Sequence, residues 1–152
     1  MADIQQQLSA ELVEFLGAKE KIVFLSTIDH EEGVPATTSI SWVFAVSPTK
    51  IRFAIDPRSR VIKNIEGNPR LTLSFIGLGS SFSVSGSGSS HLQQLDGVTI
   101  RMTEVEVDVV SVREIMYYGS KVTTEPQMEK TYNLALAEKL DHAVYAAIGR
   151  DE

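Results

Sequence analysis

The sequence predicts an α+β protein whose centre is a barrel-like sheet of mostly sequential antiparallel strands. Six segments have the length and apolar pattern of strands, and short turns separate most of them. Helical patterns occur at the start, in the middle and at the end of the chain instead of after every strand, which disfavours a βαβ architecture. Because no repeat, low-complexity tail or composition break interrupts the pattern, we expect residues 1–152 to form a single domain.

Composition and charge narrow the classes of function. Apolar residues make up 43% and charged residues 22% of the chain, as in an ordinary soluble domain. The net charge of -6 and the lack of a basic run argue against nucleic-acid binding. The absence of cysteine excludes disulfides, thiolate catalysis and cysteine metal sites. The apolar runs are too short for a membrane span, and the first residues lack a secretory pattern, so we expect a cytoplasmic protein without a membrane partner.

The first half of the chain contains a helical stripe followed by strand patterns. Apolar residues recur at helical spacing from Ile4 to Leu16, and Gly17 ends that helix. The remaining expected elements are a strand over 21–28, a polar turn over 29–33, one long strand over 34–46, and a hairpin turn over 47–50 leading into the strand 50–55.

The second half continues with strands and closes on helices. The serine- and glycine-rich stretch 81–91 could be a flexible linker, but its alternation favours a strand in which Gly86 and Gly88 suit a bulge or the close approach of another backbone. Two more strands are expected over 70–76 and 98–110. A short helix through 116–118 would be capped by Asp108 or Ser111 and closed by Gly119. A final helix is expected over 125–148, and its apolar stripe contains Tyr132, Leu136, Leu140, Val144 and Ile148.

A short helix is predicted between the strands 50–55 and 70–76. Asp56 or Ser59 can cap its N-terminus, Gly67 can take a left-handed exit, and Asn68-Pro69 prevents its continuation. Helical spacing gives this segment two faces, a buried one with Val61, Ile62 and Ile65 and a polar stripe with Arg60, Lys63, Asn64 and Gly67.

The start of this helix has the composition of an anion site. A hydroxyl at Ser59 and cations at Arg60 and Lys63 stand beside a helix N-terminus, an arrangement suited to phosphate. The alternative interpretation is a solvated connector that carries ordinary surface charges. Spacing alone favours the connector.

Other chemistries find little support in the sequence. The three histidines have no partner at metal-ligand spacing, and no serine elbow, dinucleotide fingerprint or Walker loop is present. At a period of two, Glu104, Glu106 and Asp108 form the water-facing side of a strand, opposite Val105, Val107 and Val109. Trp42, the single tryptophan, is more typical of a core than of a ligand stack.

The run from Pro35 to Phe75 resembles the pyridoxamine 5′-phosphate oxidase-related family of FMN-binding split barrels. The resemblance rests on Ser-Trp-Val-Phe, Ile-Arg-Phe-Ala-Ile-Asp and Ser-Arg-Val-Ile-Lys-Asn-Ile-Glu-Gly-Asn-Pro-Arg-Leu-Thr-Leu. The later Met-Tyr-Tyr-Gly-Ser-Lys and the closing helix are similar to a small bacillus-type branch of unassigned activity. The resemblance implies a six-stranded antiparallel split β-barrel with a short crossing helix, an N-terminal helix and a C-terminal helix.

The resemblance also implies a cofactor, a site and a partner. The FMN phosphate would lie at Ser59 and Arg60, with the isoalloxazine ring against two strands and a second subunit of a homodimer completing the pocket. The implied ring positions are Ser39, Ile40, Ser41 and Trp42 on one strand and Ala54, Ile55 and Asp56 on the next.

The sequence also departs from the family pattern. Val61 stands where a lysine is common in the family, so Lys63 would have to reach the phosphate instead. Ala54-Ile55 stands where a tyrosine-threonine pair is often found, and Ser39 stands where an arginine is common. The C-terminal tryptophan-and-arginine segment of the vitamin B6 site has no counterpart. We therefore expect an FMN-dependent oxidoreductase of unknown substrate, not a true pyridoxamine phosphate oxidase. The alternatives are a non-enzymatic flavin-binding or stress-related protein, the same fold with deazaflavin or haem, and a barrel that has lost its ligand.

Overall fold

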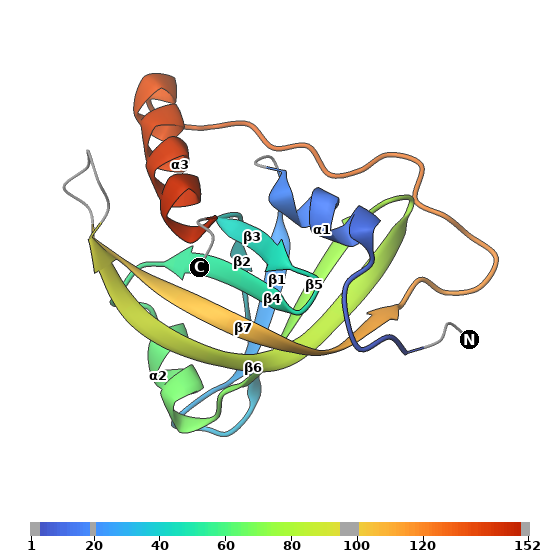
Figure 1. Cartoon of the computed structure of the whole chain (residues 1–152), viewed down its shortest axis with the longest axis horizontal. Coiled ribbons are helices and arrows are strands. Elements are labelled where there is room, and N and C mark those ends of the chain that lie inside the picture. Colours follow the sequence, from blue (N-terminus) through green and yellow to red (C-terminus); the bar gives the residue numbers. More distant parts are fainter. Residues whose placement is uncertain (1–3, 19–20, 95–100, 150–152) are drawn as a thin grey trace.

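The computed structural model describes residues 4–18, 21–94 and 101–149. These residues form a curved antiparallel sheet with three helices packed around it (Figure 1). The elements in chain order are α1 (Ala10–Gly17), β1 (Val23–Ile28), β2 (Pro35–Ile40), β3 (Val43–Ser47), β4 (Lys50–Ile55), α2 (Arg60–Gly67), β5 (Arg70–Gly77), β6 (Ser80–Gln94), β7 (Arg101–Glu114) and α3 (Leu134–Ile148).

The sheet has seven strands in the order β2-β1-β5-β6-β7-β4-β3, so the α+β split barrel is confirmed and the count of six strands is wrong. The difference arises because the single strand expected over 34–46 is broken at Ser41 and Trp42. The Val43 N–H donates to the Ser41 carbonyl over 2.9 Å, and this tight turn redirects the chain. As a result β2 pairs with β1 while β3 pairs with β4, at opposite ends of the strand order.

The core lies between the inner face of the sheet and the helices. Alternate residues of the strands point inward, and their aliphatic side chains are almost fully buried. Each such burial contributes about 1.5–3 kcal/mol relative to exposure. Members with no solvent exposure include Leu16, Val23, Leu25, Leu73, Val105 and Val107.

Helix α1 begins later than its apolar stripe predicts. The Ser9 hydroxyl accepts a hydrogen bond from the Leu12 N–H and caps the helix at Ala10. Before that cap, Gln5 pairs with Val112 of β7 like a strand residue, and Ile4 is exposed. The prediction of a helix from Ile4 is therefore wrong, because pairing with the end of β7 outweighs helical spacing over the first residues.

Helix α2 confirms the predicted start but not the predicted end. Ser59 is the N-cap, its hydroxyl accepting from the Val61 N–H over 3.2 Å, so Asp56 is not the cap. Gly67 remains in the helix and does not have a positive φ, and the chain leaves in an extended conformation at Asn68. Within the described residues, positive φ values at Leu78 and Gly79 instead form the tight turn between β5 and β6.

The serine- and glycine-rich stretch is a strand, as predicted, and not a linker. It forms most of β6, with a register shift between Ser85 and Gly86. A Cβ atom at Gly86 would lie 2.5 Å from the Asp108 carbonyl oxygen, and one at Gly88 would lie 2.9 Å from Leu71. The backbone approach explains why position 86 needs glycine, whereas at position 88 the near atom is the end of a side chain.

Strand β7 is only partly as predicted. Val105 and Val107 are fully buried, but Glu104, expected in water, is 1% exposed; Val98 lies outside the described residues. Arg52 of β4 is also fully buried, and its guanidinium donates to Glu106 over 3.2 Å and to the Ile148 carbonyl over 3.3 Å. The end of α3 covers this part of the sheet and excludes water from the face that carries Arg52 and Glu104. Alternation along one strand could not reveal this, because it depends on a helix far away in the sequence.

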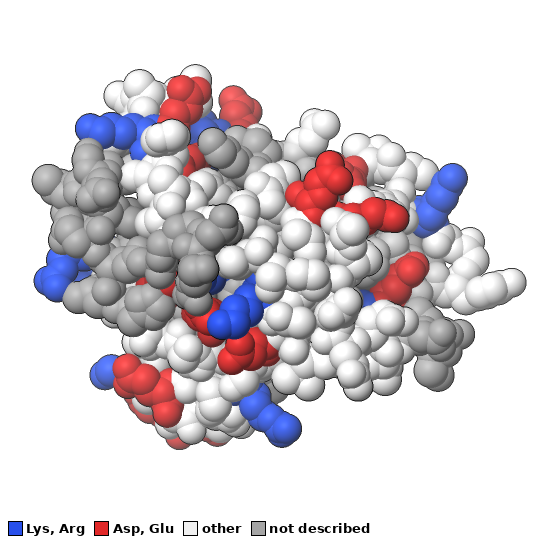
Figure 2. Space-filling model, viewed as in Figure 1, with Lys and Arg blue, Asp and Glu red and all other residues white. Residues whose placement is uncertain are grey.

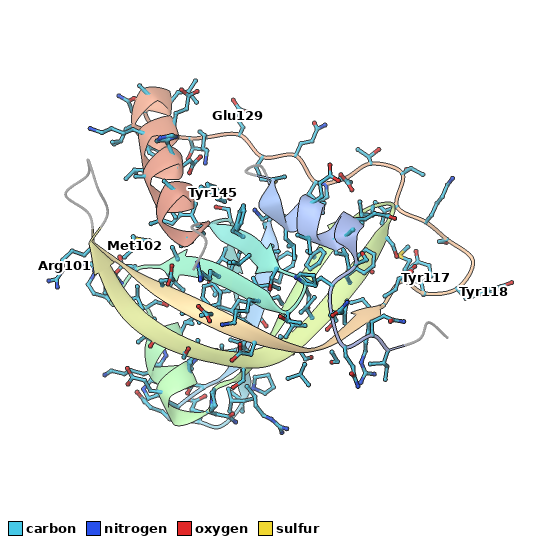
Figure 3. The ribbon with its side chains drawn as sticks, viewed as in Figure 1. Arg101, Met102, Tyr117, Tyr118, Glu129 and Tyr145 are labelled. Atoms are coloured by element: carbon cyan, nitrogen blue, oxygen red, sulfur yellow. The ribbon has the colours of Figure 1, made fainter. Side chains whose placement is uncertain are left out.

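The chain after β7 differs most from expectation. No helix forms at 116–118, where Tyr117 and Tyr118 are highly exposed and project from the body of the molecule (Figure 3). The last helix starts at Leu134 after the Asn133 cap and not at Glu125. No described helix is long and apolar enough to cross a membrane.

Helix α3 packs on β3 and β4, whereas α2 lies on the other side of the long β6–β7 pair (Figure 1). Leu140, Val144 and Ile148 of the predicted apolar stripe are buried, but Tyr132 and Leu136 remain about half exposed. Ala137 and Tyr145 complete the buried face of the helix.

Candidate functional site

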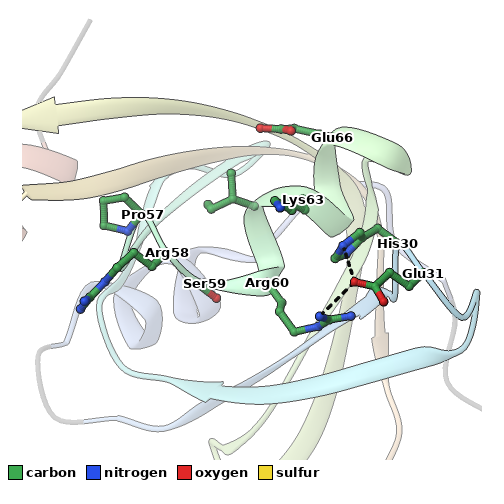
Figure 4. Close-up of a pocket in the computed structure, with 9 residues that line it drawn as sticks. His30, Glu31, Pro57, Arg58, Ser59, Arg60, Lys63 and Glu66 are labelled. Carbon is green, nitrogen blue, oxygen red and sulfur yellow. Dashed lines mark hydrogen bonds and ion pairs between the residues drawn. The ribbon is translucent and has the colours of Figure 1, made fainter.

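A hollow of about 460 Å³ lies at the N-terminus of α2, facing the turn between β1 and β2 (Figure 4). It contains the three residues that the sequence predicts for a phosphate, Ser59, Arg60 and Lys63. The structure therefore brings these three together around one space. The other lining residues are His30, Glu31, Pro57, Arg58, Ile62 and Glu66.

Ser59 and the first turn of α2 supply hydrogen-bond donors. As the N-cap, Ser59 uses an oxygen lone pair to accept from the Val61 N–H, which leaves its own hydroxyl hydrogen available to an anion. The helix dipole also favours negative charge at this point.

Arg60 reaches across the hollow to the β1–β2 turn. Its guanidinium donates to Asp29 over 2.7 Å and to Glu31 over 3.5 Å, and the second of these contacts is drawn in Figure 4. The hydrogen bond from Arg60, together with backbone bonds from Glu32 and Glu31, lowers the pKa of Asp29 to about 2. Arg60 is thus oriented by a fixed carboxylate, and its remaining N–H groups can serve a ligand.

Asn64 ties the same turn to the helix. Its side chain is 2% exposed, which corrects its predicted place on a polar surface stripe. The Asn64 oxygen accepts from the His30 N–H over 2.9 Å and bonds the His30 Nδ1 over 2.8 Å, while its amide donates to the Thr27 hydroxyl over 3.0 Å. In the Ser59–Arg60–Asn64 pattern, the serine caps the helix, the arginine faces the hollow, and the asparagine joins the helix to the end of β1 and the turn after it.

The remaining cations of the hollow differ in their partners. Arg58 donates to Asp56 over 3.0 Å, and this bond lowers the pKa of Asp56 to about 2. In Figure 4 the Arg58 side chain points away from Arg60. Lys63 is exposed and has no ion pair with any described residue, so its ammonium group is the least compensated charge at the site.

A second hollow of about 310 Å³ lies on the β2 side of Arg60. Ser59 and Arg60 border both spaces, and the second one is rich in hydroxyl groups. It extends the candidate site from the helix toward the end of β2. Its other lining residues are Thr27, Asp29, Ala36, Thr37, Thr38, Val61 and Asn64.

The predicted ring segments meet each other beyond this second hollow. The Ala54 N–H donates to the Trp42 carbonyl over 3.0 Å, which joins the end of β4 to the junction between β2 and β3. Ser39 and Ser41 are exposed, Ile40 and Ile55 half-buried, and Ala54 buried. Asp56, which follows β4, is exposed. None of these positions lines either hollow at the start of α2.

Trp42 is part of a small core and not an exposed platform. Its indole packs in a cluster with Met102, Val144 and Ile148, and its Nε1–H donates to Asp141 over 2.7 Å.

Several residues at or near the site have no local sequence signal. Asp29 and Glu31 meet Arg60, and His30 meets Asn64, across more than 25 residues of chain, and Asp141 meets Trp42 across 99. Only the acidic turn over 29–33, set against a basic helix start, offered a hint through charge complementarity. Among the described residues, no cluster of three histidines or carboxylates could hold a metal ion.

The fold defines this protein as a split barrel with a hollow at the N-terminus of its crossing helix. Residues 8–118 match the model of the pyridoxamine 5′-phosphate oxidase family, and the chain belongs to that family. None of the curated proteins resembles the sequence closely enough to count as a match.

Solved structures share the fold at low sequence identity. HupZ of Group A Streptococcus is 10% identical, with a TM-score of 0.61 over 76% of this chain and 98% of that one. An FMN-binding protein from Syntrophomonas wolfei is 16% identical, with a TM-score of 0.55 over 70% of this chain and 88% of that one. An F420 reductase is 15% identical, with a TM-score of 0.54 over 66% and 94% of the two chains.

Proposed function

We propose that this protein is a flavoprotein that binds FMN with its phosphate at the N-terminus of α2. The observation that carries the proposal is the convergence of Ser59, Arg60 and Lys63 on one hollow at the start of a capped helix. Each group offers a donor to phosphate oxygens, and charge-assisted bonds of this kind are the strong ones. The family membership and an FMN-binding structural neighbour support the same cofactor.

The ring of the flavin would lie against the junction between β2 and β3 and the end of β4. Ser39 to Trp42 and Ala54 to Asp56 supply this surface, and the bond between the Ala54 N–H and the Trp42 carbonyl holds the two segments in register. The hydroxyl-rich second hollow extends from Ser59 and Arg60 as far as Thr38, the residue before Ser39. Bound FMN would supply hydride or electron transfer, while the chain binds and orients it.

The activity we propose is that of an FMN-dependent oxidoreductase acting on a small molecule. Pyridoxamine phosphate oxidation is not proposed, because Ser39, Ala54 and Ile55 depart from the residues common in oxidases of this family. A deazaflavin is the second candidate cofactor, favoured by the structural similarity to an F420 reductase. A protein that stores or shields flavin without turnover would use the same binding residues.

A second copy of the chain is proposed to complete the pocket, in a cytoplasmic homodimer. A row of hydroxyl side chains crosses five neighbouring strands on the outer face of the sheet, each residue directly opposite the next. This face is uncharged along the row and built of small side chains, which permits close packing. Its members are Thr37, Ser26, Thr72, Ser85 and Ser111, and Thr37 also borders the second hollow.

Figure 2 shows charges of both signs scattered over the visible face without a broad basic patch. This distribution and the net charge of -6 fit a small-molecule cofactor better than a nucleic acid.

The absorbance spectrum of the purified protein tests the proposal. We expect a yellow protein that releases FMN on heating, or an apoprotein whose melting temperature rises when FMN is added. Turnover of NADH or NADPH by the loaded protein would favour an enzyme over a flavin store. A colourless protein whose melting temperature does not respond to FMN would contradict the proposed function.

A further inference from the structure

Helix α3 lies outside the residues that match the family, yet it contacts the predicted ring surface. The match ends at residue 118, and α3 covers 134–148. Its buried face packs on β3 and β4, and Figure 3 shows Tyr145 on the side of the helix turned toward the sheet. The family match therefore gives no information about this helix.

One turn of α3 binds both residues of the junction between β2 and β3. The Tyr145 hydroxyl donates to the Ser41 carbonyl over 2.7 Å, and the Trp42 Nε1–H donates to Asp141 over 2.7 Å. Asp141 and Tyr145 are four residues apart, so they share a face of the helix. The same Ser41 carbonyl accepts from Val43 N–H in the turn that breaks the strand.

Both helix residues are themselves held in place. Asp141 pairs with Lys130 over 3.1 Å. Tyr145 accepts from the Lys21 amine over 3.2 Å, and that amine also donates to the Ala18 carbonyl. Because a carbonyl oxygen can only accept, the Tyr145 hydrogen must go to Ser41 and Lys21 must donate. Lys21 is 3% and Tyr145 8% exposed, so the Lys21–Tyr145 hydrogen bond is shielded from water.

We propose that Tyr145 and Asp141 are positioning residues that hold the Ser41–Trp42 junction in the shape required by the ring of the bound cofactor. The ligand part of this inference rests on the proposed function. The structural part does not, because the two hydrogen bonds are made by the protein alone. The phosphate end of the site lies on α2, on the other side of the β6–β7 pair, and should not depend on α3.

A pair of matched variants tests the role of Tyr145. Tyr145→Phe removes the hydroxyl that bonds Ser41, and Tyr132→Phe removes the same group from a half-exposed residue before the helix. Trp42 is the only tryptophan, so its fluorescence reports on the junction without any ligand. We expect a red-shifted, more readily quenched Trp42 emission in Tyr145→Phe alone, with circular dichroism like that of the unaltered protein.

Ligand binding provides the second readout. FMN and riboflavin should both bind Tyr145→Phe more weakly by about two- to tenfold, the effect of one hydrogen bond, because the ring surface is common to both. Inorganic phosphate should bind it as it binds the unaltered protein. Asp141→Ala should resemble Tyr145→Phe, whereas Asp141→Asn keeps an acceptor for the indole and should restore the Trp42 emission.

The outcomes separate the inference from the proposed function. Unchanged Trp42 emission in Tyr145→Phe and Asp141→Ala would overturn the inference whether or not flavin binds. A shifted emission with unchanged flavin affinity would also overturn it, because α3 would then only stabilise the fold. An unaltered protein that binds no flavin would refute the proposed function, and with it the cofactor-positioning role, whatever Trp42 shows.

Discussion

Lys21 carries a prediction about stability that can be worked through from the structure. Its amine is 3% exposed, donates to Ala18 and Tyr145, lies 5.0 Å from the centre of the Tyr145 ring, and has no ion pair with a described carboxylate. Burial lowers the pKa of Lys21 to about 7, from 10.5 in an exposed lysine. The charged and titratable neighbours named by the structure are Tyr145 and Glu125, which lines the same small cavity.

The direction in which stability changes with pH follows from how many protons the folded and unfolded chains bind. Between about pH 7 and 10.5 the unfolded chain keeps the Lys21 proton while the folded chain loses it, so stability rises with pH in this window. Below about pH 7 Lys21 is protonated in both the folded and the unfolded chain. The full cost of burying its charge then lowers stability, and Lys21 adds no further dependence on pH. Linkage gives a gain of about 2 kcal/mol in the free energy of unfolding from pH 7 to pH 9.

Urea unfolding followed by Trp42 fluorescence at pH 7, 8 and 9 measures this gain. Lys21→Met keeps the length and apolar stem of the side chain but removes the titrating group, so its stability should rise by about 2 kcal/mol less over the same range. Lys121→Met, at an exposed position, should follow the unaltered protein. Parallel pH dependence in Lys21→Met and the unaltered protein would refute the account of a buried, unpaired amine.

Two further predictions concern the start of α2. Asn64→Ala should lower the free energy of unfolding by about 1–3 kcal/mol, because the His30 N–H and the Thr27 hydroxyl lose a buried partner. Asn68→Ala, at the half-buried C-cap of the same helix, is the control in denaturant titration, and equal losses of stability in the two variants would contradict the role of Asn64 in joining the helix to the β1–β2 turn. Glu31→Gln removes a carboxylate that shares Arg60 with the phosphate, so FMN should bind about two- to fivefold more tightly at low salt, with less gain at high salt. Glu66→Gln alters a residue of the same hollow that makes no contact with Arg60, and an equal gain there would show a general charge effect instead.

The sequence predicted well those features that depend on local pattern. Strand alternation located β4 and β5 closely, and the hydroxyl at Ser59 with the Asn68-Pro69 stop located α2. Ser59, Arg60 and Lys63 fall within one helical turn, so helix geometry alone places them together, and the structure gathers them around one hollow.

Features that depend on distant contacts were not predictable. The break at Ser41 and Trp42 arises because β2 pairs with β1, β3 pairs with β4 at the other end of the strand order, and α3 bonds the junction between them. Nothing in the run from Pro35 to Ser47 shows where those partners are. Glu104 belongs to an alternating strand, and only the packing of the end of α3 makes that face dry. Asn64 was placed on the surface for the same reason, because its partners lie more than 30 residues away.

The measurement that tests the central claim most directly compares FMN with riboflavin in the unaltered protein and in Arg60→Ala. These ligands differ only in the phosphate, so their difference in affinity isolates the anion site at α2. We expect FMN to bind more tightly than riboflavin, and Arg60→Ala to weaken FMN by about 1.5–3 kcal/mol while leaving riboflavin nearly unchanged. Lys121→Ala should change neither affinity. Equal affinities for FMN and riboflavin, or an FMN preference that survives in Arg60→Ala, would contradict a phosphate site at Arg60.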